Sequence, residues 1–98
     1  EAVSSPEVDA VIVSTPNHLS AEIAIHALQM GKDLLVEKPF GRNFLESKAI
    51  LDAATKSKRT LIVKTGFNHR FHPAIAKAKN LIDQGVIGKL LSLRARYG

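Results

Sequence analysis

The chain has 98 residues, of which 45% are hydrophobic and 23% charged, and its formal net charge at pH 7 is +5. This composition is typical of a soluble globular protein, and the length allows no more than about one complete domain. No apolar run approaches the roughly 18 residues of a membrane span and no signal-like segment is found, so we expect a cytoplasmic protein without membrane contacts. The absence of cysteine excludes disulfides and thiolate metal sites.

The first part of the chain predicts a strand followed by a helix. Residues 9–13 form a continuous apolar run, the pattern of a strand buried on both faces, and the polar residues 1–8 are interpreted as a loop. Asn17 is the predicted N-cap of the helix and Gly31 its left-handed stop. The apolar side chains of the helix recur at helical spacing, at Leu19, Ile23, Ile25, Ala27, Leu28 and Met30.

The middle of the chain repeats this alternation of strand and helix. Residues 34–36 predict a second buried strand, which runs directly into a Glu-Lys-Pro sequence at residues 37–39. Proline ends such a strand because it cannot donate to the sheet. Asn43 followed by Glu46 resembles a capping box that opens a second helix, and residues 60–65 predict a third strand.

The last part of the chain predicts a third helix and a strand of a different kind. His72 and Pro73 begin the helix, because proline is well placed in a first helical turn, and Gly85 ends it. Apolar and polar residues alternate over 91–97, which indicates a strand with one face in water. We therefore expect this strand to open a separate, antiparallel sheet.

The predicted order is β-α-β-α-β-α followed by one further strand, which indicates an α/β fold. Strand starts are spaced by about 25 residues, enough for a crossover helix each time. Such crossovers are right-handed and make the first three strands parallel. Parallel strands end along one edge of their sheet, where open α/β sheets bind their ligands.

Polar residues are concentrated at the three predicted strand ends, in residues 15–18, 37–39 and 68–70. Each group also has a structural interpretation: a helix cap, an ion pair between Glu37 and Lys38, and an ordinary loop. Adjacent residues of an extended segment point to opposite faces, so the two charges are not expected to satisfy each other directly. A lysine partly buried in a cleft at this edge could instead give a proton to a substrate oxygen.

Three stretches together carry a specific resemblance to a known family. They are residues 11–18 (Val-Ile-Val-Ser-Thr-Pro-Asn-His), 34–39 (Leu-Leu-Val-Glu-Lys-Pro) and 66–71 (Gly-Phe-Asn-His-Arg-Phe). In order and spacing they are similar to the Gfo/Idh/MocA family of NAD(P)-dependent oxidoreductases, with the Glu-Lys-Pro signature the most telling element. The resemblance extends over nearly the whole chain.

The resemblance implies both the domain organisation and the activity. The fold would be a partial Rossmann-like, doubly wound parallel sheet followed by one strand of an antiparallel α+β domain. Residues 1–87 would form the C-terminal half of a dinucleotide-binding domain, and residues 88–98 would begin a domain for substrate binding or oligomerisation. The full-length protein would be a homo-oligomeric dehydrogenase that transfers a hydride between NAD or NADP and a sugar, inositol or related polyol.

The resemblance also implies roles for particular residues. Lys38 would lie beside the nicotinamide and the substrate hydroxyl, where it orients the substrate or transfers a proton. The Lys38–Pro39 peptide would be cis and aim the lysine into the cleft. Asn68 and Arg70 would join Lys38 in binding substrate. The residues implied on the cofactor side are Thr15, Pro16, Asn17, His18, Glu37, Lys38 and Pro39.

Two departures from the family pattern lead us to expect a segment of a longer protein. The six glycines never make the spacing of the phosphate-binding turn, and the residue that distinguishes NAD from NADP is missing with it. Further acid/base residues would lie beyond Gly98. We therefore expect the 98 residues alone to be inactive and prone to self-association, because an apolar strand edge would be open.

Two other classes of function bear on these residues. A non-catalytic relative that binds a nucleotide or sugar for regulation would share the fold, and an intact Lys38 argues only mildly against it. A nucleic-acid-binding module would need a contiguous basic surface, whereas the basic residues here are spread along the chain. No metal-ligand spacing is present, and His69 with His72 is the closest approach to one.

Overall fold

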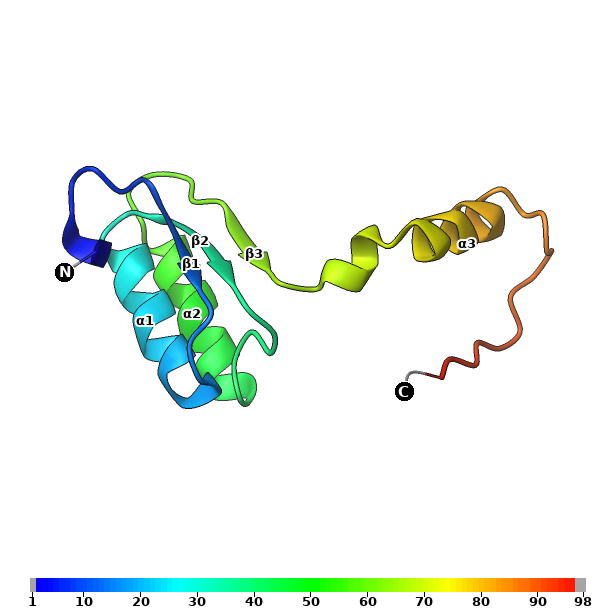
Figure 1. The fold of residues 1–98 in the computed structure, drawn as a ribbon, viewed down its shortest axis with the longest axis horizontal. Helices are drawn as coiled ribbons and strands as arrows, with labels where there is room; N and C mark the ends of the chain where they lie inside the picture. The colour runs from blue at the N-terminus through cyan, green and yellow to red at the C-terminus, as the bar shows by residue number, and fades with distance from the viewer. Residues whose placement is uncertain (1, 97–98) are drawn as a thin grey trace. The chain divides into compact units, whose positions relative to one another are not determined.

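The computed structural model describes residues 2–96, which form two compact units that divide between Phe67 and Asn68 (Figure 1). The first unit contains a parallel sheet and two α-helices, and the second contains a short 3-10 helix and one α-helix. Among the described residues, no helix has the length and apolar character needed to cross a membrane.

The sheet of the first unit has three parallel strands in the order β1-β2-β3. The register pairs Val13 with Val36 and Val36 with Thr65, so the three strands end in one row. This confirms the predicted parallel sheet of α/β class. The strands are β1 (Ala10–Val13), β2 (Asp33–Val36) and β3 (Val63–Thr65).

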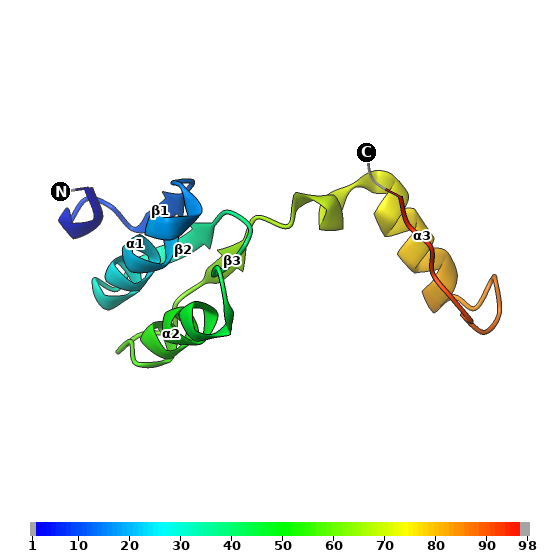
Figure 2. The ribbon, with the colours of Figure 1, turned by 90° about the horizontal axis from the view of Figure 1, so that it is seen from below.

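Two crossover helices, α1 (Asn17–Gln29) and α2 (Phe44–Thr55), lie side by side and pack on the same face of this sheet (Figures 1 and 2). Most of the buried residues of α1 are alanines, whose small side chains let the helix lie close to the strands. From α2, Ile50 is fully buried. The core consists of Val13, Ala21, Ala24, Ala27, Leu28, Leu34, Val36 and Ile50.

The opposite face of the sheet is exposed, which corrects the prediction that its strands are buried on both faces. Ile12 is 71% exposed, and its register partner Leu35 is 40% exposed. The cause is topological. Consecutive parallel strands joined by right-handed crossovers place successive helices on one face, so α1 and α2 leave the other face uncovered.

The ends of the elements in the first unit follow local chemistry. Gly31 has a φ of +72° directly after the cap of α1, as predicted for a left-handed stop. The third strand covers Val63–Thr65 rather than the predicted 60–65, and just before it the N–H of Ile62 donates to the Asp33 carboxylate at 3.1 Å. A 3-10 turn, Ala2–Ser4, lies in the segment that was expected to be a loop.

The second unit contains η2 (Asn68–Phe71) and α3 (Pro73–Asp83), and the predicted start of this helix is confirmed. His72 is the N-cap, and its Nδ1 accepts the N–H of Ala74 at 3.2 Å. Residues 91–96 form no strand in the structure, and Tyr97 lies outside the described residues. The alternating pattern of residues 91–96 is typical of one strand of a sheet. A strand forms only against a hydrogen-bonded partner strand, and the described residues contain no partner strand for this segment.

Candidate functional site

The carboxyl ends of the strands form one edge, at which two of the predicted polar groups meet. Beyond the last residues of β1 and β2, the N–H of Glu37 donates to the carbonyl of Val13 at 2.9 Å. On the other side, the N–H of Gly66 donates to the carbonyl of Val36 at 2.9 Å. The segments that follow β1 and β2 therefore leave the sheet next to each other, as predicted from the parallel topology.

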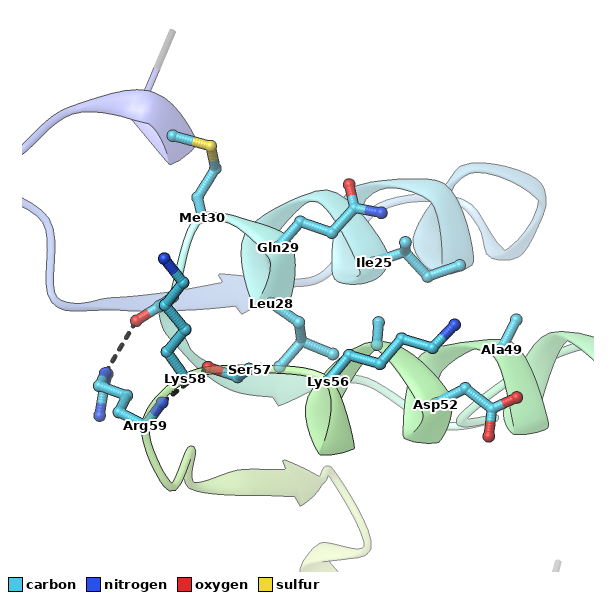
Figure 3. Close-up of a pocket in the computed structure, with 12 residues that line it drawn as sticks. Ile25, Leu28, Gln29, Met30, Ala49, Asp52, Lys56, Ser57, Lys58 and Arg59 are labelled. Carbon is cyan, nitrogen blue, oxygen red and sulfur yellow. Dashed lines mark hydrogen bonds between the residues drawn. The ribbon is translucent and has the colours of Figure 1, made fainter.

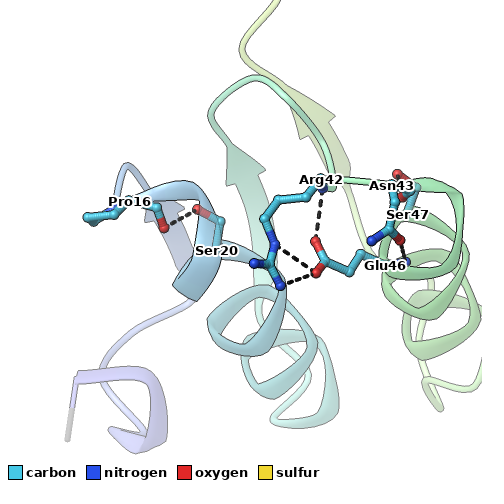
Figure 4. A network of polar contacts seen from close by, with 6 residues as sticks. All are labelled: Pro16, Ser20, Arg42, Asn43, Glu46 and Ser47. Carbon is cyan, nitrogen blue, oxygen red and sulfur yellow. Dashed lines mark hydrogen bonds and ion pairs between the residues drawn. The ribbon is translucent and has the colours of Figure 1, made fainter.

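At the first of these segments the structure corrects the predicted helix cap. The N-cap of α1 is Pro16 rather than Asn17, and no side chain accepts a hydrogen bond from the first turn. Asn17 is instead the first helical residue, exposed together with His18. The hydroxyl of the buried Ser20 donates to the carbonyl of Pro16 at 3.3 Å (Figure 4). It also lies 3.2 Å from the carbonyl of Thr15, to which it can donate as well, and these contacts hold the turn.

The sequence motifs alone do not indicate a role for Ser20. Only its position in the helix indicates this contact, because a serine within the first turn of a helix can donate a hydrogen bond to the carbonyl four residues earlier. The uncapped N–H groups of this turn carry the positive end of the helix dipole. Together with the exposed amide of Asn17, they give this corner the character of a site for polar or anionic groups.

The second corner is the Glu-Lys-Pro segment after β2, and all three residues are exposed. Among residues 2–96, neither Glu37 nor Lys38 takes part in an ion pair, so the structural interpretation as a pair is wrong for this structure. The Glu37 carboxylate instead accepts the backbone N–H of Lys38 at 3.1 Å. The Lys38–Pro39 peptide is cis, as the family resemblance implied.

The loop after Pro39 is tied to the start of α2 by a second polar cluster (Figure 4). The Glu46 carboxylate accepts the backbone N–H of Arg42 at 2.9 Å and its Nε at 2.8 Å. These hydrogen bonds lower the pKa of Glu46 below its ordinary value and raise that of Arg42. Asn43 caps the helix as predicted, with its side-chain oxygen accepting the N–H of Glu46 at 3.0 Å.

This cluster departs from a full capping box. In that motif the Glu46 side chain would return to the backbone N–H of Asn43, whereas here it is engaged by Arg42 one residue earlier. The spacing of four residues between an arginine and a glutamate is the sequence signal that could have indicated this contact between Arg42 and Glu46. The result is a fixed connection between the Glu-Lys-Pro segment and α2.

The remaining predicted site residues, Asn68 and Arg70, lie in η2 of the second unit and are exposed. Their proposed contact with substrate stays a prediction. In the part of the chain that the structure describes, no three His, Cys, Asp or Glu side chains are grouped so that they could hold a metal ion.

A groove of about 830 Å³ lies between the C-terminal ends of α1 and α2 (Figure 3). Arg59 forms one side of it, with its Nε donating to the carbonyl of Gly31 at 3.0 Å and its Nη2 pairing with Asp33 at 2.9 Å. The helices end where the chain enters β2 and β3, so this groove lies at the opposite end of the sheet from the Glu-Lys-Pro segment. None of the predicted site residues lines it.

Comparison with known proteins places these features among oxidoreductases. The model of the Gfo/Idh/MocA family, described as an oxidoreductase family with an NAD-binding Rossmann fold, matches residues 1–65. Levoglucosan dehydrogenase of Pseudarthrobacter phenanthrenivorans is 43% identical over 95 residues, which are 97% of this chain and 24% of that protein. The scyllo-inositol 2-dehydrogenase (NAD(+)) of Bacillus subtilis is 44% identical over 90 residues, which are 91% of this chain and 25% of that protein.

A solved structure gives the same result in three dimensions. Levoglucosan dehydrogenase in complex with NADH and levoglucosan matches the chain with a TM-score of 0.85 at 42% identity. The match covers 92% of this chain and 24% of the solved chain. The 98 residues therefore span about a quarter of the length of the relatives that they match.

Proposed function

This chain belongs to the Gfo/Idh/MocA family of NAD-binding oxidoreductases, and on that premise we propose that it is part of a dehydrogenase. The enzyme would transfer a hydride between NAD and a sugar, inositol or related polyol. The observation that carries the proposal is the Glu-Lys-Pro segment, which leaves β2 at the carboxyl edge with Lys38 exposed and without an ion-pair partner in the described part of the chain.

The residues at this edge fit the nicotinamide half of the cofactor. The uncapped first turn of α1 offers N–H groups, and Thr15, Asn17 and His18 offer side chains that can hydrogen-bond a ribose or a carboxamide. Pro16, Glu37, Lys38 and Pro39 would line the same side. The glycine-rich turn that would hold the diphosphate is not among these 98 residues. NAD, when bound, supplies the acceptor for the hydride that leaves a carbinol carbon.

Lys38 would act directly on the substrate. As the ammonium, its side chain would donate a hydrogen bond to the hydroxyl oxygen at the reacting carbon and hold it in place; as the neutral amine, it would accept the hydroxyl proton while the carbonyl forms. Asn68 and Arg70 would bind other hydroxyls of the substrate. The polyol class is supported by the relatives, which are a levoglucosan dehydrogenase and a scyllo-inositol dehydrogenase.

We also propose a cytoplasmic homo-oligomer in which residues 1–87 belong to the cofactor domain and residues 88–98 begin the next domain. Exposed apolar side chains on the sheet, such as Ile12, support the burial of this face against another protein surface. The native mass of the full-length protein tests the oligomer, and a monomer would refute it.

The test of the activity uses the full-length protein with NAD and a panel of levoglucosan, scyllo-inositol and myo-inositol. We expect NADH to form with at least one of them. Lys38→Ala should lower kcat by about 100-fold or more, in the range of general acid–base effects, and should lower NAD affinity far less. Lys58→Ala is the matched control, because it removes the same charge from the groove at the other end of the sheet.

Three outcomes would change the proposal. Unchanged kcat in Lys38→Ala would refute the catalytic role of this lysine. Binding of NAD or of a polyol without any turnover would favour the non-catalytic relative. An equal loss in Lys58→Ala would show that the effect is one of overall charge.

A further inference from the structure

The Glu37 carboxylate lies directly against the backbone of Gly66, the first residue after β3. A Cβ built on Gly66 would be 2.9 Å from the Cδ and the Oε2 of Glu37 and 3.0 Å from its Oε1. Carbon atoms without a bond between them do not approach so closely in proteins, because their repulsion rises steeply below about 3.5 Å. A residue with a side chain at position 66 therefore cannot coexist with the present position of the carboxylate.

Backbone conformation does not explain the glycine at this position. Among the described residues, the glycines with positive φ are Gly31, Gly85 and Gly88, where a side chain would be strained. Gly66 is not one of them, so alanine could adopt its backbone angles. The obstacle to alanine at position 66 is steric, because its methyl group would need the space that the Glu37 carboxylate fills.

The carboxylate in this space holds the peptide from which the proposed catalytic lysine projects. Its Oε2 accepts the N–H of Lys38 at 3.1 Å. The backbone around it is fixed on both sides, since the N–H of Glu37 donates to the carbonyl of Val13 and the N–H of Gly66 donates to that of Val36. The Glu37 carboxylate thus binds the Lys38 peptide at the place where the ends of all three strands are hydrogen-bonded to one another.

We propose that Gly66 is a positioning residue for the dehydrogenase reaction: by lacking a side chain it admits the Glu37 carboxylate, which orients the Lys38 peptide. This inference rests on the proposed function. Glu37 acts on the reaction through Lys38, and Gly66 acts through Glu37. The carboxylate is the flexible end of an exposed side chain, so a methyl group at position 66 displaces it toward solvent without unfolding the sheet.

The experiment compares Gly66→Ala, Glu37→Ala and the double variant in the full-length protein, with NAD and whichever polyol the wild type oxidises. Misplacing a catalytic group by about 1 Å costs up to about 100-fold in rate, so each single variant should lower kcat by about 10- to 100-fold. In Gly66→Ala, which keeps every residue proposed to line the cofactor, the KM for NAD should change less than kcat. Because both changes break one contact, the double variant should be no slower than the slower single variant.

Two further readouts separate positioning from mere structural damage. Glu37→Gln keeps an acceptor oxygen of nearly the same shape and should recover most of the turnover lost in Glu37→Ala. The amide of Lys38 should exchange its hydrogen faster in Gly66→Ala and in Glu37→Ala than in the wild type, while the amides of β2 keep their protection.

The outcomes that overturn the inference are distinct from those that overturn the proposed function. Wild-type kcat in Gly66→Ala, multiplied losses in the double variant, or unchanged exchange at Lys38 would each refute the positioning role alone. A raised KM for NAD with unchanged kcat would mean that Gly66 makes room for the cofactor instead. A wild type with no NAD-linked turnover would refute the proposed function itself.

Discussion

Ile50 is the side chain of α2 whose removal should most weaken the first unit. It is fully buried, and it joins α2 to the core formed by α1 and the sheet. Truncation of a buried isoleucine to alanine costs about 2–5 kcal/mol through lost burial and the cavity left behind. The core here is small and its other sheet face is open, so the surroundings can partly relax. We therefore expect a loss of about 3 kcal/mol in Ile50→Ala.

Leu45→Ala provides the matched control on the same helix. Leu45 is 74% exposed, so only about a quarter of the 1.5–3 kcal/mol of a fully buried side chain is at stake, and the loss should stay below about 1 kcal/mol. Native-state hydrogen exchange of the full-length protein, read at the amides of β2 and α1, measures the free energy of opening of this unit. Equal losses in the two variants would refute the assignment of the core.

Three further predictions concern the loop that follows the Glu-Lys-Pro segment. Asn43→Ala removes the acceptor for the N–H of Glu46 and should cost about 1 kcal/mol, seen as faster amide exchange in the first turn of α2; unchanged exchange would argue against the cap. Gly41→Ala would place a Cβ 2.6 Å from the backbone nitrogen of Ser47, which cannot swing away as a side chain can. We expect a loss of about 1–3 kcal/mol and a lower thermal midpoint, and a wild-type midpoint would contradict the close approach. Since Arg42 lowers the pKa of Glu46 in the folded protein, this pair stabilises the fold above the unfolded-state pKa of the carboxyl, and the stabilisation is lost as the pH falls through the folded-state pKa. Glu46→Gln should flatten the loss of stability in that acid range, and an unchanged slope would show that the pair contributes nothing.

The elements of the first unit could be predicted because their signals are local. Apolar runs bounded by proline or glycine mark β1 and β2, and Asn43 marks the start of α2 through its own hydrogen bond. The common edge of the strands followed from topology alone, because right-handed crossovers leave little choice. This topology was sufficient to predict that the segments after β1 and β2 lie next to each other.

What could not be predicted depends on contacts between distant residues. The exposure of Ile12 follows from both helices packing on one face, which a run of apolar residues does not reveal. The role proposed for Gly66 depends on a carboxylate 29 positions earlier in the chain, and the motif around Gly66 alone gives no reason for a glycine. The N-cap of α1 is Pro16, whose carbonyl accepts the Ser20 hydroxyl, and the presence of Asn17 at the next position does not indicate this contact.

The most direct test of the proposed function follows the hydride itself. Levoglucosan carrying deuterium at its carbinol carbons would be incubated with the full-length protein and NAD, and the NADH would be analysed by mass spectrometry. We expect one deuterium in each NADH formed and little NADH in Lys38→Ala. If scyllo-inositol is the substrate instead, the same label on its ring carbons should transfer in the same way. NADH that forms without the label, or a protein that forms no NADH with any polyol of the panel, would contradict direct hydride transfer from a polyol to NAD.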